Sequence, residues 1–237
     1  GEDIDQYTFT MSATDGLQCL DCPVLSEEER QAMEEYREEE GAFDFSGQQG
    51  TVEKKFQVGS FTKIDAGSAF KITVRQGTTY SVTARAEEVE LMEDLRIAAQ
   101  NDELSISFDD VFKRHRGTIW IEITMPTLTE LDLSGATTTK VLNFKTIENL
   151  QIGLSGASKL AMDAEGKAIN ADISGASQLN LKGKLNELTI DASGASRINA
   201  IDAKVANVRV EASGASNIEL GATNILSKKT SGASQIT

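Results

Sequence analysis

The sequence of 237 residues is poor in the side chains that most enzymes use for catalysis. It contains one histidine, His115, together with one tryptophan and two cysteines. The many serines therefore have no histidine at a suggestive spacing that could activate them as nucleophiles. The chain also lacks a nucleophile elbow, a phosphate-binding loop and a metal-binding helix motif. We expect a protein that is not an enzyme and needs no cofactor.

Long apolar runs are also lacking. No run of about 18 apolar residues occurs, so no segment is suited to cross a membrane as a helix. No signal peptide is visible, yet the sequence begins at Gly1 without a methionine. We expect an exported protein, periplasmic or on the outer cell surface, whose signal peptide has been removed.

The two cysteines, Cys19 and Cys22, form a C-x-x-C pair. A single pair without a nearby histidine cannot supply the four ligands of a zinc site. The pair also lies outside any strand-helix-strand pattern that would favour redox chemistry. We expect a local disulfide in an exported protein, with free thiols as the alternative.

Acidic residues are concentrated in the first part of the chain. Residues 1–50 hold 14 of them against two arginines, whereas residues 51–237 hold 23 acids and 21 bases. Within the first part, Ser26 and Glu29 have the spacing of a capping box, which predicts a short helix that runs to Glu40. We interpret residues 1–50 as an acidic leader or linker. The nearly neutral remainder predicts no basic stripe and hence no nucleic-acid partner.

A Ser-Gly-Ala-Ser motif recurs through the second half of the sequence. Its glycines are separated by 21, 19, 19, 20 and 18 residues, which indicates a structural repeat. These glycines are Gly135, Gly156, Gly175, Gly194, Gly214 and Gly232.

Apolar residues recur at every second position on both sides of each glycine, which is typical of strands with one buried face. The column six residues before the glycine consists of Leu150, Ile169, Leu188, Val208 and Leu226. A unit of about 19–20 residues is too short for a strand-helix-strand crossover. The pattern therefore predicts an all-β fold, a right-handed, single-stranded parallel β-helix with the glycines at sharp corners. We expect loops at the opposite edge, at 163–168 and 202–206.

Residues 51–127 are rich in strands but lack the regular repeat. Seven strands are predicted, and Ala66-Gly67-Ser68-Ala69 resembles a degenerate corner. We expect this part to continue the stack with longer coils and to cap its first end, because an uncovered coil would expose apolar side chains. Residues 51–237 then form one domain, in which the regular coils occupy 128–237. The predicted strands cover 52–58, 61–65, 70–75, 80–86, 95–100, 104–108 and 118–124.

One column of acidic residues precedes the corners. Asp172, Asp191 and Glu211 each stand three residues before a repeat glycine, so they are expected to lie one coil apart on the outside of the helix. Such a column could bind calcium or supply a catalytic pair of carboxylates. The alternative is an ordinary solvated surface, which we favour.

One basic cluster precedes a strand. Lys113, Arg114, His115 and Arg116 are followed by Trp120. Arginine side chains pair with anionic groups and an aromatic ring can stack on a sugar, so an acidic sugar or a phosphate would fit. The alternative, which we favour, is the exposed tip of a hairpin.

Several stretches together carry a family resemblance. Besides the corners they are Leu188–Ala192, Phe61–Asp65, Phe70–Val74, Asp102–Ile106 and Ile121–Pro126. From about Val52 to Thr237 the sequence resembles the head GIN domain family of putative auto-transporter adhesins. The resemblance implies export from a Gram-negative cell, a β-helix without catalytic residues, and a role in adhesion to an extracellular carbohydrate or protein.

Two other functions remain open from the sequence. The first is a calcium-assisted enzyme that acts on polysaccharides through the acidic column. The second is a structural module whose last coil, 231–237, stacks on another chain.

Overall fold

The computed structural model describes residues 9–12, 16–19, 52–109, 117–221 and 224–237. The chain divides into two compact units, Gly1–Gln49 and Gly50–Thr237. In the first unit, β1 (Phe9–Ser12) and β2 (Gly16–Cys19) form an antiparallel pair that the sequence did not predict. The helix predicted from Ser26 to Glu40 and the partner cysteine, Cys22, lie outside the described residues.

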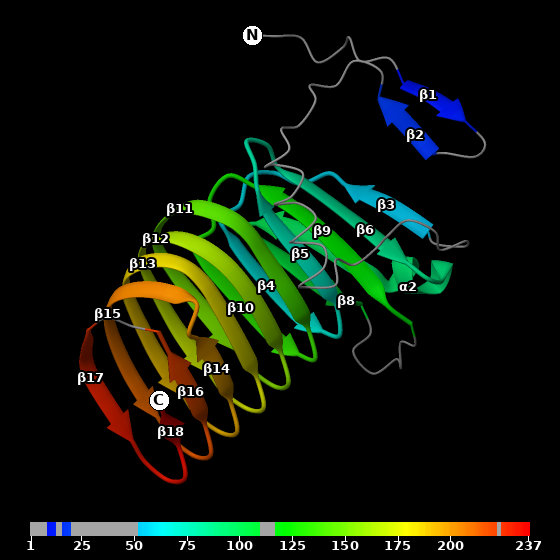
Figure 1. Cartoon of the computed structure of the whole chain (residues 1–237). Coiled ribbons are helices and arrows are strands. Elements are labelled where there is room, and N and C mark those ends of the chain that lie inside the picture. The colour runs from blue at the N-terminus through cyan, green and yellow to red at the C-terminus, as the bar shows by residue number, and fades with distance from the viewer. Residues whose placement is uncertain (1–8, 13–15, 20–51, 110–116, 222–223) are drawn as a thin grey trace. The chain divides into compact units, whose positions relative to one another are not determined.

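The second unit is a β-solenoid of about five turns, as the repeat predicts (Figure 1). Successive coils are joined by parallel strand pairs in which equivalent repeat positions lie opposite one another, such as Leu160 and Leu179. The strands of the regular part are β10 (Glu130–Gly135), β11 (Thr138–Leu154), β12 (Lys159–Ile173), β13 (Gln178–Ala192), β14 (Arg197–Ala200), β15 (Ala203–Ala212), β16 (Asn217–Leu220), β17 (Ile225–Thr230) and β18 (Gln235–Ile236).

Each coil has two sides, which meet at the corner glycine. The strands that lead into the glycines form one side, whose outer surface we call the pre-corner face. The strands that follow the glycines form the other side, with the post-corner face outside. β11, β12 and β13 run without a break around the edge opposite the corners, so both sides belong to a single sheet of 16 strands.

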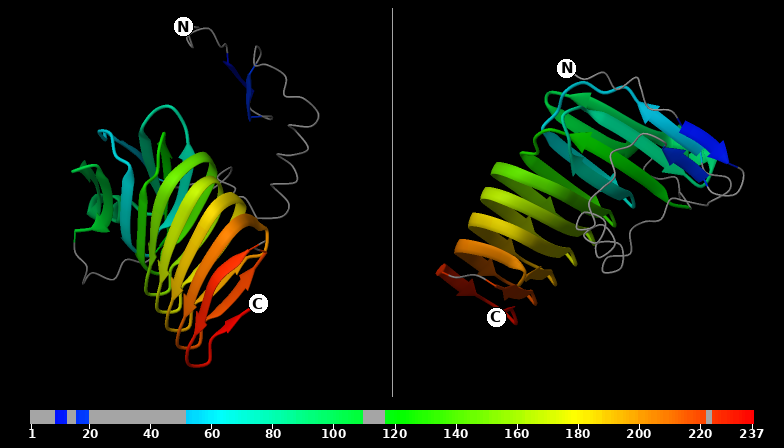
Figure 2. Two further views of the ribbon diagram at one scale, coloured as in Figure 1. Left: turned by 90° about the vertical axis from the view of Figure 1, so that its left-hand side faces the viewer. Right: turned by 45° about the horizontal axis from the view of Figure 1, so that its top comes forward.

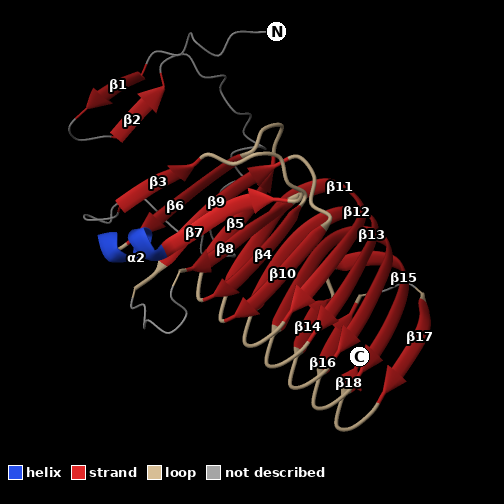
Figure 3. Ribbon diagram, turned by 180° about the vertical axis from the view of Figure 1, so that it is seen from behind, coloured by secondary structure: helices blue, strands red, loops and turns tan. Residues whose placement is uncertain are grey.

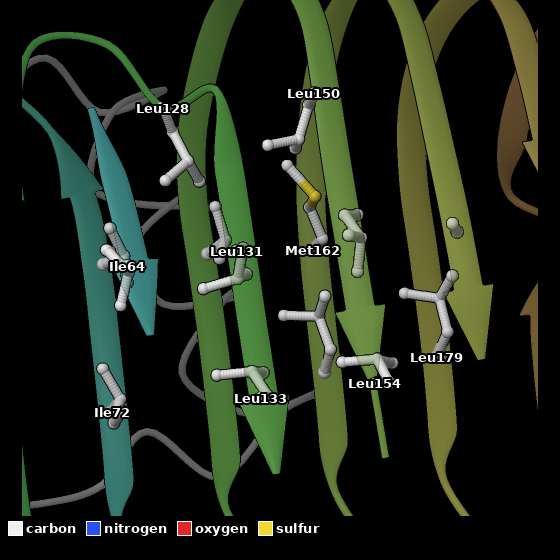
Figure 4. Close-up of a cluster of buried hydrophobic side chains, with 14 of the residues drawn as sticks. Ile64, Ile72, Leu128, Leu131, Leu133, Leu150, Leu154, Met162 and Leu179 are labelled. Carbon is white, nitrogen blue, oxygen red and sulfur yellow. The ribbon is translucent and has the colours of Figure 1, made fainter. Parts of the chain in front are cut away.

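The core is a set of apolar columns between the two sides. Leu131, Leu133, Leu150 and Leu154 point into this space, where they meet side chains such as Leu179 from the other side (Figure 4). All five are at most 2% exposed. Burial of one such leucine contributes about 2 kcal/mol relative to its exposed state. The stacked columns therefore stabilise the coils through many such side chains.

The corners lie in a row along one edge of the solenoid (Figure 3). The six repeat glycines have φ between +69° and +72°. This region is unfavourable for residues that carry a Cβ atom. Between neighbouring corners, the alanine amide donates to the glycine carbonyl of the previous coil, as in Ala157 N to Gly135 O at 2.7 Å.

The edge opposite the corners differs from the prediction. We expected a loop at 163–168, but β12 passes through these residues and pairs with β11 and β13 on both sides. A parallel ladder can follow a gentle bend when each coil bends at the same place, so no loop is needed there. The second expected loop, 202–206, is also mostly strand, because β15 begins at Ala203.

The last coil departs from the apolar column. Leu226 occupies the position six residues before Gly232, which predicts an inward side chain, yet it is 48% exposed. The pairing of β17 with β15 shifts in register after Ile225, and Leu226 has no partner in that ladder. Leu226 therefore lies at a bulge. Ile225, which pairs with the buried Val208, is also 45% exposed, because β17 is the last strand on its side and pairs with β15 alone.

The irregular part contains two further coils and an antiparallel cap. Its strands lie close to the predicted ranges, and its described residues also contain a helix, α2, that the sequence did not reveal. They are β3 (Val52–Phe56), β4 (Lys63–Ser68), β5 (Lys71–Gln76), β6 (Ser81–Ala86), α2 (Val89–Asp94), β7 (Leu95–Gln100), β8 (Glu103–Phe108) and β9 (Ile119–Met125).

The spatial order of these coils differs from their order in the chain. β4 and β5 lie against β10 and β11, whereas β8 and β9, which come later in the sequence, lie on the far side of β4 and β5. Antiparallel strands β6 and β3 extend the post-corner side beyond β9, and β7 extends the other side beyond β8 (Figure 2). The expected continuation of the stack is therefore present, but the coil of β4 and β5 lies nearer to the regular coils than the coil of β8 and β9, which follows it in the sequence.

Candidate functional site

The predicted acidic column exists on the pre-corner face. Asp172 pairs in register with Asp191, and Asp191 pairs with Glu211, so the three carboxylates project from neighbouring strands. The next residue in the column is Lys229, whose ammonium forms an ion pair with Glu211. Toward the cap, the column continues through Gly153, Asp132 and Asp65.

A groove of about 590 Å³ runs beside this column and crosses four coils. Its lining comes from the three residues that precede each corner glycine. The charged lining residues are Asp172, Asp191, Glu211 and Lys229. Serines such as Ser193 lie on the other side, and Ala192 and Ala212 lie between the two rows.

The charges of the groove shift two pKa values. Burial, followed by the negative charges of Asp172 and Glu211, raises the pKa of Asp191, although Lys229 acts in the opposite direction. The hydrogen bond and charge of Glu211 raise the pKa of Lys229. The groove therefore carries more negative charge than Lys229 neutralises, and a positively charged or hydrogen-bond-donating group fits it best.

Outside the groove, burial and the neighbouring Glu130 and Asp65 raise the pKa of Asp132. Glu130 itself pairs with Lys63, with Nζ 2.7 Å from Oε2. The acidic character of the pre-corner face thus continues toward the cap.

The acidic column does not converge on a metal position. Within the described ranges, no group of three or more histidine, cysteine, aspartate or glutamate side chains is arranged to hold a metal ion. Successive outward side chains of a parallel ladder point in the same direction and do not surround a common point, which accounts for this arrangement.

The corner serines are engaged with the backbone. Ser158 Oγ donates to the carbonyl oxygen of Ser155 at 2.7 Å, and Ser196 and Ser216 make the same bond in their own coils. These hydroxyls are buried and satisfy corner carbonyls. Because each of these hydroxyls is buried and bound to a backbone carbonyl of its own corner, they have the geometry of a structural element.

The basic cluster predicted at Lys113–Arg116 also lies outside the described residues, but Trp120 does not. Trp120 is half-buried on β9, on the post-corner face. The ammonium of Lys71, on the adjacent β5, lies 5.5 Å from the centre of its ring. The indole therefore takes part in a cation–π contact in which it holds Lys71 in place.

Bases are concentrated on the post-corner face, which the sequence did not predict. The near-neutral total charge of residues 51–237 led us to expect no basic stripe. The near-neutral total hides an uneven distribution, since bases exceed acids among the outward side chains of the post-corner face, whereas the pre-corner face carries the acidic groove. The repeat alignment could have revealed Lys159 and Arg197 three residues after their glycines, but their alignment with Lys71 and Trp120 depends on the strand register.

No helix of the described segments combines the length and apolarity that crossing a membrane requires. Residues 60–237 match the family described as putative auto-transporter adhesin, head GIN domain. The match covers about three quarters of the chain and confirms the resemblance seen in the sequence. No curated protein matches the chain.

Several solved structures share the fold. A putative adhesin from Bacteroides fragilis is 21% identical with a TM-score of 0.71, and the alignment covers 80% of this chain and 98% of that one. A putative lipid binding protein from Parabacteroides distasonis is 13% identical with a TM-score of 0.55, covering 80% and 97%. A putative adhesin from Parabacteroides merdae is 15% identical with a TM-score of 0.53, covering 80% and 96%. At these identities the likeness establishes the fold alone.

Proposed function

Because the chain belongs to the head GIN domain family of putative auto-transporter adhesins, we propose that it is an exported, non-enzymatic module that binds an extracellular carbohydrate or protein. The solenoid is the scaffold, and its outward side chains make the contacts. Adhesion needs a large exposed surface and no reaction centre, which agrees with the scarcity of catalytic side chains.

The observation that carries this proposal is the groove on the pre-corner face. It presents carboxylates from three successive coils and serine hydroxyls from four, at intervals of about 4.8 Å. A ligand that extends across several coils can make the same contact repeatedly. Many weak contacts to one extended ligand add up to useful affinity without a deep pocket.

The test is binding of the labelled full-length chain to an array of glycans and extracellular-matrix proteins, with calcium and with a chelator. We expect saturable binding to one ligand class. A variant with Asp172→Asn, Asp191→Asn and Glu211→Gln reports on the groove. The matched control, Glu165→Gln with Asp202→Asn, removes exposed acids from the opposite edge.

The other results of the array have defined meanings. Loss of binding only in the chelator would revive the calcium hypothesis. Cleavage of a bound glycan would favour the polysaccharide-active enzyme, and concentration-dependent light scattering without any binding would favour an assembly module. Absence of saturable binding in both buffers would contradict adhesion.

A further inference from the structure

The two faces of the solenoid carry opposite net charge. On the post-corner face, the outward charged residues of β5, β6, β9, β14 and β16 and of the first halves of β11, β12 and β13 are mostly bases. The bases are Lys71, Arg75, Arg85, Lys140, Lys145, Lys159, Lys182, Lys184 and Arg197, with Lys55 on the adjoining β3, and the acids are Glu122, Asp163, Glu165 and Glu219, with Glu53 on β3. The pre-corner face carries the acidic groove.

One column of the post-corner face has a regular alternation. The strand register places these residues opposite one another in spatial order: Arg85, Trp120, Lys71, Thr138, Lys159, Gln178, Arg197, Asn217 and Gln235. A cation occupies every second strand from Lys71 to Arg197, whereas Arg85, at the cap end of the column, forms an ion pair with Glu53 of β3, with Nε 2.7 Å from Oε2. Between the cations of the column lie the indole and uncharged groups that form hydrogen bonds.

This alternation sets a spacing. Neighbouring strands lie about 4.8 Å apart, so the cations follow one another at about 9.6 Å along the solenoid axis. An extended polysaccharide advances by nearly one strand width per sugar residue. The column therefore matches a polysaccharide with one negative charge for every two sugars, while the uncharged side chains lie beside its hydroxyl groups.

Nucleic acid fits this column less well. A DNA duplex carries one negative charge per about 1.7 Å of its axis, which is several times denser than the cations of the column. Most phosphates would lie opposite no cation, and Glu122 and Glu219 project from the same face. A sparsely charged polymer therefore fits better than a densely charged one.

The individual cations suit this task. Lys159 and Arg197 are exposed, and no ion pair of the described residues involves either of them. A guanidinium group such as that of Arg197 can bind a carboxylate or sulfate through two parallel hydrogen bonds. Lys71 is positioned by the ring of Trp120, which reduces the entropy that it would lose when a ligand binds.

We propose that this column binds an acidic polysaccharide with one carboxylate or sulfate group per two sugars, laid across the coils along the solenoid axis. The inference rests on the proposed adhesive function and names the ligand class and the face that it contacts. It adds the post-corner face as a second binding surface, separate from the acidic groove of the pre-corner face, which would take a different, hydrogen-bond-donating or cationic part of an extracellular ligand.

The test measures the affinity of the full-length chain for hyaluronan, which has one carboxylate per disaccharide, with neutral dextran and duplex DNA as comparison ligands. We expect hyaluronan to bind, and its affinity to fall as salt is added, because binding releases counterions. The double variant Lys159→Gln, Arg197→Gln should weaken binding about tenfold, since it removes two charge-assisted contacts.

The matched control is Lys184→Gln, Lys204→Gln, which removes two exposed lysines from neighbouring coils outside the column. It should retain nearly full affinity. The inference is overturned if hyaluronan does not bind, if both double variants weaken binding equally, or if DNA binds more tightly through the same column. Adhesion itself would survive any of these results if the array identified another ligand, so the two failures are distinguishable.

Discussion

The corner of Gly175 stacks directly on the corner of Gly156. The amide of Ala176 donates to the carbonyl oxygen of Gly156 at 2.8 Å, and a Cβ atom on Gly175 would lie 2.4 Å from that same oxygen. The residue at this position must therefore both accept a positive φ and leave room for the coil below.

We predict that Gly175→Ala lowers the free energy of unfolding by at least about 2 kcal/mol, because the alanine would be strained at φ +71° and would clash with backbone atoms. Chemical denaturation measures the change. Gly59→Ala is the control, since nothing lies within 4 Å of its Cβ position, and it should change stability by less than about 0.5 kcal/mol. Equal effects of the two substitutions would contradict the stacked-corner geometry.

A second prediction compares two leucines at the same repeat position. Leu150 is fully buried, whereas Leu226 is 48% exposed at the register shift of the last coil. Leu150→Ala should destabilise the solenoid by about 3 kcal/mol through loss of burial and a cavity. Leu226→Ala should cost less than about 1 kcal/mol. A large loss at Leu226 would mean that the column continues inward through the last coil.

A third prediction separates two corner serines. Ser158 Oγ donates to Ser155 O at 2.7 Å, whereas the buried Oγ of Ser177 has no hydrogen-bond partner. Ser158→Ala should cost about 1 kcal/mol, because the hydrogen bond is lost. Ser177→Ala should be neutral or stabilising, because it removes an unsatisfied polar atom from the interior. Thermal unfolding of both variants decides whether this ranking holds.

The fourth prediction concerns pH. Because the pKa of Asp191 is raised above 3.8, the folded protein binds more protons than the unfolded chain between that value and the folded pKa. Stability from this group therefore falls as the pH rises through that window. Asp191→Asn removes the penalty, so the variant should be at least as stable as the wild type at pH 7, and this advantage should shrink toward pH 4.

Denaturation curves at several pH values measure this difference, and Glu165→Gln serves as the control at the opposite edge. A variant of Asp191 that is clearly less stable than the wild type at pH 7 would show that its carboxylate makes a favourable contact in the folded protein.

The regular coils could be predicted because each repeat supplies its own alignment. Once the glycines are aligned, the alternation of Leu188, Ile190 and Ala192 identifies the inward face, and the position of Asp191 places it beside Asp172 and Glu211. In a solenoid the position of a residue within its repeat also identifies its neighbour in space, because the residue lies beside the equivalent residue of the next coil.

The irregular part shows where this logic ends. The sequence predicted strands β8 and β9. It did not predict that they lie beyond β4 and β5, because no sequence repeat aligns the two pairs of strands. The column that joins Trp120, Lys71 and Lys159 therefore needed the structure. Leu226 illustrates a second limit of prediction from the repeat. Its position in the repeat predicts burial, but a register shift in the last coil leaves the side chain exposed.

Adhesion without catalysis is the central claim, and one measurement tests it most directly. The full-length chain is titrated onto the array ligands, and the mass of each bound ligand is determined afterwards. The account predicts saturable binding to one class of extracellular carbohydrate or protein, with the ligand recovered unchanged. Absence of binding to every class, or recovery of a cleaved ligand, would contradict it.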